Sequence, residues 1–505
     1  MTHRSQNRRK DNSSRHASGQ RASLPRSMTV TLRIVFVICL AWYAPQAHAK
    51  EGRLYVGWAT NSITPDEPVA LAGQRHVRIA HKVLDPVTCT ALAIETRGDD
   101  TAVDQAILVS CDLVAIRGGL QDQLRKSLKS KLPDFDVNKI FLHATHTHTA
   151  PVTYGGAYDI PKDGVMQPAE YRRFFVKQAE QAVLQAWSGR KPAGMSWALA
   201  HAAIGYNRRA VYSDGKAVMY GRTTGDTFRR IEGYEDHGVE LLFFWNDRRQ
   251  LSGIVVNIAC PSQETEGLSE VSADFWHEVR QELRKQYGKD LFVLPQCAAA
   301  GDLSPHLMFR KRAEQIMLDR KGISRRQEIA RRLARAIDEV LPHAQQPRTH
   351  LDFRHLVDTI SLPRRKATPE EYKQAQAKLV ELEGRISGPS WEKSQQHRII
   401  SSFEHPDENA THDMELHVLR LGDIAMASNP FEYYVDFGIR IKSRSPAVLT
   451  MIVQLAGPGT YVPTRRAVAG GGYSAEISSN LVGPKGGQVL VEETIKRIKR
   501  LWEPE

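Results

Sequence analysis

The chain has 505 residues, of which 41% are hydrophobic and 25% charged, and this is the composition of an ordinary globular protein with a substantial core. Its formal net charge is +12, but more than half of that excess lies in the first 33 residues. The rest of the chain has no stripe of interleaved basic and aromatic residues, which excludes nucleic acid as an expected partner.

The first 49 residues have the pattern of an N-terminal extension with a signal peptide. Basic residues precede a short apolar segment at residues 34–40, and Ala47-His48-Ala49 has the small residues that a signal peptidase recognises. The apolar segment is too short to span a bilayer. We expect cleavage near Ala49 and an exported, periplasmic or secreted chain. An uncleaved anchor is the alternative, and Met1 and Met28 are both candidate starts.

Strand and helix patterns alternate along residues 50–505. Short apolar segments typical of buried strands occur at residues 105–110, 139–142, 253–259 and 291–294. Amphipathic or apolar helical patterns occur at residues 120–128, 171–187, 275–287 and 324–340. This alternation predicts an α/β fold, with a mixed β-sheet core flanked by helices in one large domain.

Residues 345–412 depart from this rhythm. A helix start is evident, with Thr368 as cap, Pro369 in the first turn and Glu371 three residues after the cap. The surrounding sequence is polar and irregular, so we interpret residues 345–412 as an insertion or flap. Strands and a helix resume from Met414, and an amphipathic helix is predicted over residues 490–501.

Two histidines directly follow the apolar segment at residues 139–142. Alternate residues of an extended chain point the same way, so His146 and His148 are expected to face one cavity. Neutral imidazole is a common zinc ligand. The alternative is a polar strand end whose histidines are solvated or hydrogen-bonded.

Two further segments carry candidate chemistry. The segment from Gly301 to His306 follows a strand and contains Asp302 and Ser304, which indicates a nucleophilic serine or a loop that binds an oxyanion. A simple Asp/Ser turn is the alternative. Glu432 begins a helix-like segment after a strand, where a carboxylate is a suitable ligand for a divalent metal.

Together these segments resemble the catalytic domain of neutral, non-lysosomal ceramidases. The shared segments occur in that family's order: Gly57…Ile63-Thr64-Pro65, Thr145-His146-Thr147-His148, Gly301-Asp302-Leu303-Ser304-Pro305, Pro430-Phe431-Glu432 and Tyr461…Tyr473. The resemblance covers nearly all of residues 53–480. It implies a zinc-dependent amidohydrolase that cleaves an N-acyl lipid such as ceramide through a metal-activated water.

The resemblance also implies a role for each matching residue. The implied Zn²⁺ ligands are His146, Cys260, Glu432 and Tyr461. The implied catalytic residues are His148 as general base, Tyr473 and Arg208 at the oxyanion, and Ser304 at the substrate, with Gly301 and Asp302 beside it. Arg209 remains an alternative to Arg208.

The chain departs from the family pattern in two places. Cys260 stands where the family has its second histidine ligand; a thiolate binds zinc well but would make the ion a weaker Lewis acid. The alternatives are that Cys260 is a small buried residue and zinc is lost or weakly held, or that His277 or His306 substitutes. The chain also ends soon after Tyr473, so we expect it to lack the family's C-terminal immunoglobulin-like domain, which puts ceramide itself in doubt.

Three functions therefore compete. The first is an amidase for N-acyl lipids, the second a hydrolase for another exported amide or ester, and the third a non-catalytic binding protein with a degraded metal site. The expected partner is a small-molecule or lipid substrate, with a membrane surface as one setting for the encounter. We expect no nucleic acid and no obligate protein partner. Four of the five cysteines would survive cleavage, which permits disulfides outside the cell, but their spacing defines no pairing.

Overall fold

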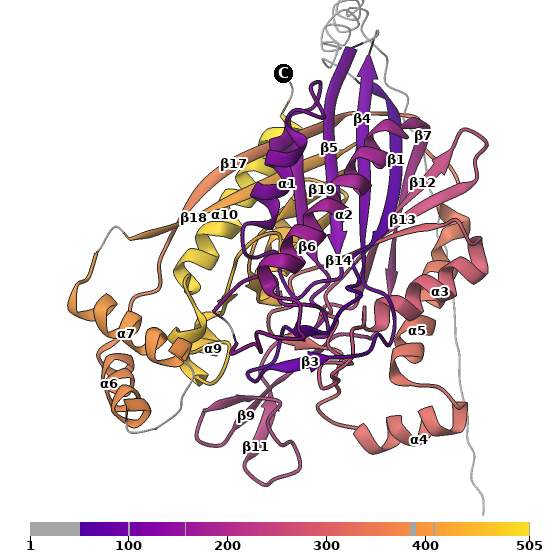
Figure 1. The fold of residues 1–505 in the computed structure, drawn as a ribbon. Helices are drawn as coiled ribbons and strands as arrows, with labels where there is room; N and C mark the ends of the chain where they lie inside the picture. The colour runs from indigo at the N-terminus through magenta and orange to yellow at the C-terminus, as the bar shows by residue number, and fades with distance from the viewer. Residues whose placement is uncertain (1–50, 99–100, 157, 384–389, 408–409, 504–505) are drawn as a thin grey trace, which may run out of the picture. The chain divides into compact units, whose positions relative to one another are not determined.

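A large mixed β-sheet forms the centre of the fold in the computed structural model, which describes residues 51–98, 101–156, 158–383, 390–407 and 410–503 (Figure 1). Eight of the sheet's nine strands follow the order β14-β13-β12-β7-β1-β4-β5-β6, and β16 pairs with β1. In that order the bounds are Phe292–Cys297, Leu251–Ile258, Gly238–Asn246, Lys191–His201, Gly52–Ser62, Thr88–Gly98, Thr101–Cys111 and Ile140–Ala144, with His350–Leu351 for β16. The predicted signal peptide and its cleavage site lie outside the described residues.

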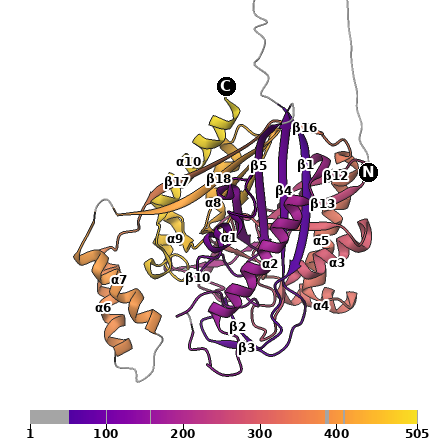
Figure 2. The same ribbon diagram turned by 45° about the horizontal axis from the view of Figure 1, so that its top comes forward.

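Parallel and antiparallel pairs coexist in this sheet, which confirms the predicted α/β class with a mixed sheet. The pairs β5–β6 and β13–β14 are parallel, whereas β4 pairs antiparallel with both β1 and β5. Helix α2 (Pro168–Ser188) crosses β1 and β4 on one face of the sheet (Figures 1 and 2). Its apolar side buries Phe175 and Ala179 in the same core cluster as Ala91 and Val109 of the sheet.

A second, smaller sheet covers the other face. Its strands follow the order β17-β18-β19-β21, with bounds Phe353–Pro363, Thr411–Leu421, Ile424–Ser428 and Leu449–Val453. Leu92 and Leu108 of the large sheet share one core with Leu419 and Met426 of the small sheet. Helices α8 (Val435–Arg444) and α10 (Pro484–Trp502) close the outer side of the small sheet. The result is a layered arrangement of helix, sheet, sheet and helix.

The predicted insertion at residues 345–412 contains part of this second sheet. Strand β17 pairs with β18 in continuous antiparallel register from Phe353↔Leu421 to Pro363↔Thr411. Only the connection between these strands protrudes, as helices α6 (Pro369–Glu383) and α7 (Ser390–Glu404), which pack on each other away from the sheets (Figures 1 and 2). The described residues all belong to one compact unit.

Several local predictions hold at the level of single residues. Helices α1 (Leu120–Leu128) and α3 (Phe275–Tyr287) match the predicted ranges, and Ser324 forms a capping box at the start of α5 (Arg325–Val340). The cysteines within the described residues are all free and buried. Of the described helices, none combines the length and the apolar character needed to cross a membrane.

The large sheet curls, so that loops from distant strands meet. The Ser110 hydroxyl of β5 donates to the Pro295 carbonyl of β14, 2.7 Å away, although these strands lie far apart in the sheet order. The backbone N–H of Ala144, at the end of β6, donates to Leu455, which follows β21. The segments that leave β6, β13 and β14 therefore converge near the segment that leaves the second sheet.

A buried ion pair fixes helix α3 beside this point of convergence. Arg280 donates from both terminal nitrogens to the Asp112 carboxylate, at 2.8 and 3.0 Å, and Asp112 is fully buried. Asp112 also accepts a 3.4 Å hydrogen bond from the hydroxyl of Thr145, the neighbour of His146.

We expect Arg280→Met to lower the free energy of unfolding by about 3–5 kcal/mol, because it leaves the buried Asp112 carboxylate without its cationic partner. Urea denaturation measures this change. The control is Arg348→Met, which removes an exposed pair with Asp423 and should cost less than about 1 kcal/mol. Equal effects of the two substitutions would contradict the role given to the buried pair.

Candidate functional site

Side chains from four separated segments meet where the loops converge. Strand β20 (Glu432–Tyr433) pairs in parallel with β22 (Tyr461–Val462), and the register places Glu432 directly beside Tyr461. His146 and His148 follow β6 and are both buried, and His146 lies against Glu432. Arg208, from the turn between β8 (Tyr206–Asn207) and β9 (Arg209–Tyr212), completes the group.

The backbone of His146 has an unusual conformation, and its ring is fixed by a hydrogen bond. Its φ of 70° lies in the left-handed region, which residues other than glycine adopt rarely. The ring Nδ1 lies 2.6 Å from the Val114 carbonyl oxygen. Because a carbonyl can only accept, Nδ1 carries a proton and donates it, and Nε2 is the nitrogen that faces the site.

The Nε2 nitrogen of His146 faces a carboxylate. Its Nε2 lies 3.3 Å from Oε2 of Glu432, and both side chains are buried. Burial raises the pKa of Glu432, but His146 and a hydrogen bond from Tyr461 outweigh it and bring the pKa below its ordinary value. The carboxylate is thus ionised and acts as an acceptor.

The donor pattern around His148 is equally well defined. Arg208 donates from a terminal nitrogen to Oε1 of Gln263 at 3.0 Å, and this fixes the amide because a guanidinium cannot accept. The Gln263 amide nitrogen then lies 2.9 Å from Nε2 of His148 and donates to it. Burial lowers the pKa of His148 well below its ordinary value, so the ring is neutral with its lone pair on Nε2.

Three atoms able to bind a metal therefore lie close together. The Nε2 atom of His146 lies 3.3 Å from both Glu432 Oε2 and His148 Nε2. A proton on His146 Nε2, or a cation in its place, would join the imidazole to the carboxylate. Imidazole nitrogen and carboxylate oxygen are zinc ligands, and the phenol of Tyr461 adjoins them.

The fit to a cation rests on the pair His146–Glu432 with Tyr461 beside it. In the part of the chain that the structure describes, no group of three or more His, Cys, Asp or Glu side chains is arranged to hold a metal ion. The Nε2 atom of His148 is close, but its lone pair already accepts from Gln263.

Cys260 is placed apart from the other predicted ligands. Its sulfur contacts the carbonyl oxygens of Ile204 and Pro261, at 3.5 and 3.6 Å, within an apolar cluster that includes Trp276. Burial raises the pKa of the thiol well above its ordinary value. The structure thus places Cys260 in an apolar core cluster, in the segment directly after β13.

In the loop after β13, the side chain that reaches the site is that of Gln263. The sequence patterns did not predict this residue. An amide carries no metal-ligand signature. The available signal was that Ala259, Cys260 and Pro261 extend the apolar sequence beyond the strand, which leaves Ser262-Gln263 as the first polar pair of the turn. Of the two proposed substitutes, His306 lies beside the site, with Nε2 2.8 Å from the Gln263 carbonyl oxygen. His277 lies in α3, and none of its described contacts reaches His146 or Glu432.

The two candidate arginines have different surroundings. Arg208 donates to Gly301 O at 3.0 Å and lies 3.4 Å from the Tyr461 hydroxyl. Burial opposes its charge, but Tyr220, Tyr461 and Glu432 raise its pKa further above the ordinary value. Arg209 instead pairs with Glu232 and donates to backbone carbonyls, including that of Tyr473 at 3.0 Å. Arg208 is the arginine in the site, and Arg209 supports the loop that carries Tyr473.

The remaining predicted residues lie around this group. The Tyr473 ring centroid is 5.6 Å from that of Tyr461, and Tyr473 is 40% exposed, so it lies at the rim. Ser304 is fully buried, and its hydroxyl accepts from the backbone N–H of His306 at 3.0 Å. Ser304 therefore has a structural contact in its loop, and no described contact with either site histidine.

Gly301 and Asp302 position other site residues. A Cβ on Gly301 would lie 2.3 Å from the Glu432 carbonyl oxygen, so the missing side chain lets this loop close onto β20. Asp302 accepts from the backbone N–H of Val435 and from the Asn207 amide, both at 2.9 Å. Burial raises the pKa of Asp302 to about 7.

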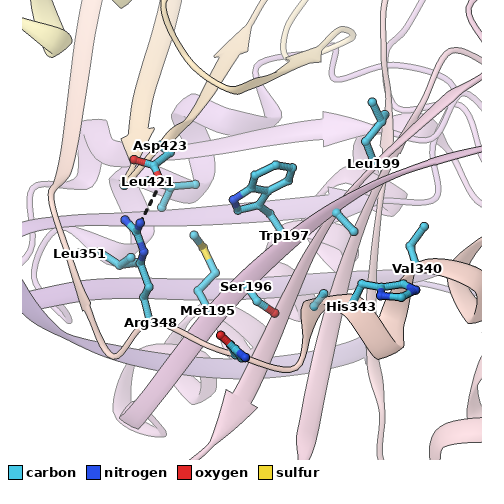
Figure 3. Close-up of a pocket in the computed structure, with 14 residues that line it drawn as sticks. Met195, Ser196, Trp197, Leu199, Val340, His343, Arg348, Leu351, Leu421 and Asp423 are labelled. Carbon is cyan, nitrogen blue, oxygen red and sulfur yellow. Dashed lines mark ion pairs between the residues drawn. The ribbon is translucent and has the colours of Figure 1, made fainter.

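A surface pocket of about 540 Å³ lies elsewhere on the molecule. It is lined by Met195 to Leu199 of β7 and by residues that include Arg348 and Asp423 (Figure 3). None of the predicted site residues lines it.

The chain matches no known protein-family model and no curated protein sequence. It does match solved structures. Neutral ceramidase from Pseudomonas aeruginosa aligns with a TM-score of 0.63 and 17% identity, over 89% of this chain and 75% of that chain. A ceramidase complexed with C2 aligns with a TM-score of 0.62 and 16% identity, over 89% of this chain and 75% of that chain. The chain thus has a ceramidase-like fold, as the motifs predicted.

Gly73 leaves the space that the His148 ring occupies. Its φ is +99°, and a Cβ there would lie 2.4 Å from Cγ of His148. We expect Gly73→Ala to lower the free energy of unfolding by about 1–2 kcal/mol through backbone strain and by at least about 1 kcal/mol more through overpacking. Chemical denaturation measures the sum.

The matched control is Gly164→Ala, which has a positive φ of +70° but no atom within 4 Å of the added Cβ. It should show the backbone cost alone. Combining Gly73→Ala with His148→Gly should remove the extra cost, because the three nearest atoms to the added Cβ are Cγ, Cβ and Nδ1 of His148. An unchanged cost in the double variant would contradict the contact.

Proposed function

We propose that this chain is an exported hydrolase that cleaves the amide bond of an N-acyl lipid, and that its site holds Zn²⁺. The carrying observation is the 3.3 Å approach of His146 Nε2 to Glu432 Oε2, beside a neutral His148 with its lone pair on Nε2. The ceramidase-like fold supports an amide substrate with a lipid chain. The N-terminal sequence supports action in the periplasm or outside the cell.

His146, Glu432 and Tyr461 would hold the ion. Bound Zn²⁺ would supply Lewis-acid activation of the attacking water and of the amide carbonyl. The contribution of the protein is a buried cluster in which the ligand atoms are already aimed: the Val114 carbonyl fixes the His146 tautomer, and the β20–β22 register fixes Glu432 against Tyr461.

His148 is the proton-transfer residue in this proposal. Its neutral ring accepts a proton at Nε2 as the water attacks, and the same Nε2–H is then given to the leaving amine. Neutrality at pH 7 follows from burial, since burial lowers the pKa of the imidazole. Gln263 would yield its place on Nε2 to the water.

Hydroxyl and guanidinium donors lie beside the ligand pair. Arg208 reaches toward Tyr461, and Tyr473 stands at the rim beside Tyr461. These groups would stabilise the negative charge that develops on the carbonyl oxygen. Arg208 keeps its charge because Tyr461 and Glu432 compensate for its burial.

Metal content tests the ligand set. We expect roughly one zinc per wild-type chain by elemental analysis, and at least a tenfold weaker affinity in His146→Ala and Glu432→Gln, because each removes a donor. Cys260→Ser and Cys260→His should keep zinc, since the Cys260 sulfur faces the core. Zinc loss in a folded Cys260→Ser protein would instead restore Cys260 as a ligand, and a zinc-free wild type would favour the non-catalytic binding protein.

Turnover of a fluorescent N-acyl sphingosine tests the reaction. We expect His148→Ala to lower kcat by about 10²- to 10⁴-fold with zinc content unchanged, because it removes the proton acceptor alone. His201→Ala, on the exposed end of β7, is the control. A series of acyl lengths separates a lipid amidase from a hydrolase of other amides or esters, and wild-type turnover in His148→Ala would refute the assigned role.

A further inference from the structure

The second nitrogen of the His148 ring needs a partner. Because Gln263 donates to Nε2, the ring proton lies on Nδ1. Nδ1 is buried and makes no hydrogen bond of normal geometry. A buried N–H group without an acceptor is costly, so the atom that faces it matters.

The facing atom belongs to Glu266. Its Oε2 lies 3.4 Å from Nδ1 of His148, in the loop between β13 and α3. This distance is long for an N–H···O bond. Catalytic hydrogen bonds are often long without substrate and shorten in the reacting complex.

Contacts with three residues hold Glu266 in place. Its second oxygen, Oε1, lies 3.2 Å from Nε2 of His306. Its backbone carbonyl accepts from Arg78 at 2.8 Å and from the Gln74 amide at 3.0 Å. The same Arg78 guanidinium donates to the His148 carbonyl at 2.5 Å. One buried guanidinium therefore fixes the backbones of Glu266 and His148 relative to each other.

We propose that Glu266 is the positioning residue of His148: its carboxylate faces Nδ1 and, with Gln263 on Nε2, keeps the ring proton on Nδ1, so that Nε2 takes a proton once the water replaces the Gln263 amide. The effect on turnover rests on the proposed function, whereas the tautomer exists without any substrate. During attack the O–H bond of the water breaks and an N–H bond forms at Nε2. The resulting imidazolium is compensated by the Glu266 carboxylate, which stays ionised. The Nε2 proton then passes to the leaving nitrogen, and the starting tautomer returns.

The tautomer can be measured directly. Protein labelled with ¹⁵N-histidine should show His148 with its proton on Nδ1 in long-range ¹H–¹⁵N spectra, with the signal assigned through His148→Asn. Glu266→Gln keeps an acceptor oxygen and should largely preserve this tautomer. Glu266→Ala should shift a measurable fraction to the Nε2–H form. A wild-type ring protonated on Nε2 overturns the proposal.

Kinetics provide the second arm. We expect Glu266→Ala to lower kcat by at least about tenfold with KM changed less than about threefold, and Glu266→Gln to fall between Glu266→Ala and wild type. Glu270→Ala is the matched control, because it makes the same chemical change in the same loop without a described contact to His148. Thermal unfolding of each variant identifies any loss that comes from the fold, and Glu266→Gln serves if Glu266→Ala does not fold.

The two proposals can fail separately. If wild-type protein turns over N-acyl substrate and Glu266→Ala keeps its kcat, the positioning role is refuted while the hydrolase stands. If wild-type protein turns over no N-acyl substrate, the proposed function fails, and the spectra alone decide whether Glu266 sets the His148 tautomer.

Discussion

The close approach of the His146 imidazole to the Glu432 carboxylate is the contact around which the site is organised. A buried carboxylate is costly unless other groups compensate its charge and satisfy its oxygens. Tyr461 donates to it, and Arg208 lies close enough to lower its pKa. Arg208 is itself buried, and it is held by Gly301 and Gln263. The negative charge of Glu432 is thus compensated by groups on loops from both sheets, and this requires those loops to converge.

For so many loops to meet at one point, the backbone must adopt conformations and close approaches that most residue types do not allow. His146 adopts a left-handed conformation at φ 70°, and Gly73 is needed because any side chain there would occupy the His148 ring position. Gly301 allows its loop to lie against the backbone of Glu432. Strain and missing side chains at this point are costs that the two-sheet core must offset. The Arg280–Asp112 pair, which reaches Thr145, contributes on the side of α3.

Sequence reasoning predicted what depends on local pattern and motif order. The alternating elements gave the mixed α/β class, and spaced motifs identified His146, His148, Glu432 and Tyr461, which do meet. The direction of a side chain could not be predicted from these patterns. Cys260 matches a ligand position along the chain, yet its sulfur points into the core. The second sheet was also missed in part, because the polar, half-exposed β17 lies beside helices α6 and α7 that resemble an insertion. Helix α10 begins at Pro484, before the predicted residue 490, since Gly486 and Gly487 weaken the helical pattern while allowing close packing on Val482 and Phe437.

The loop after β13 explains how the site differs from its sequence-based expectation. An imidazole in this loop would add a third ligand, whereas the loop instead brings Gln263 to Nε2 of His148 and Glu266 toward Nδ1. Both nitrogens of one ring are therefore set by neighbours from the same turn, and His306 joins the turn to the Ser304 loop. A ring whose two nitrogens are both held by neighbours is suited to proton transfer in a single direction. That transfer depends more on the fixed geometry of the ring than on its charge. The same constraint makes His148 a poor substitute ligand, because a metal on Nε2 would first have to displace the Gln263 amide.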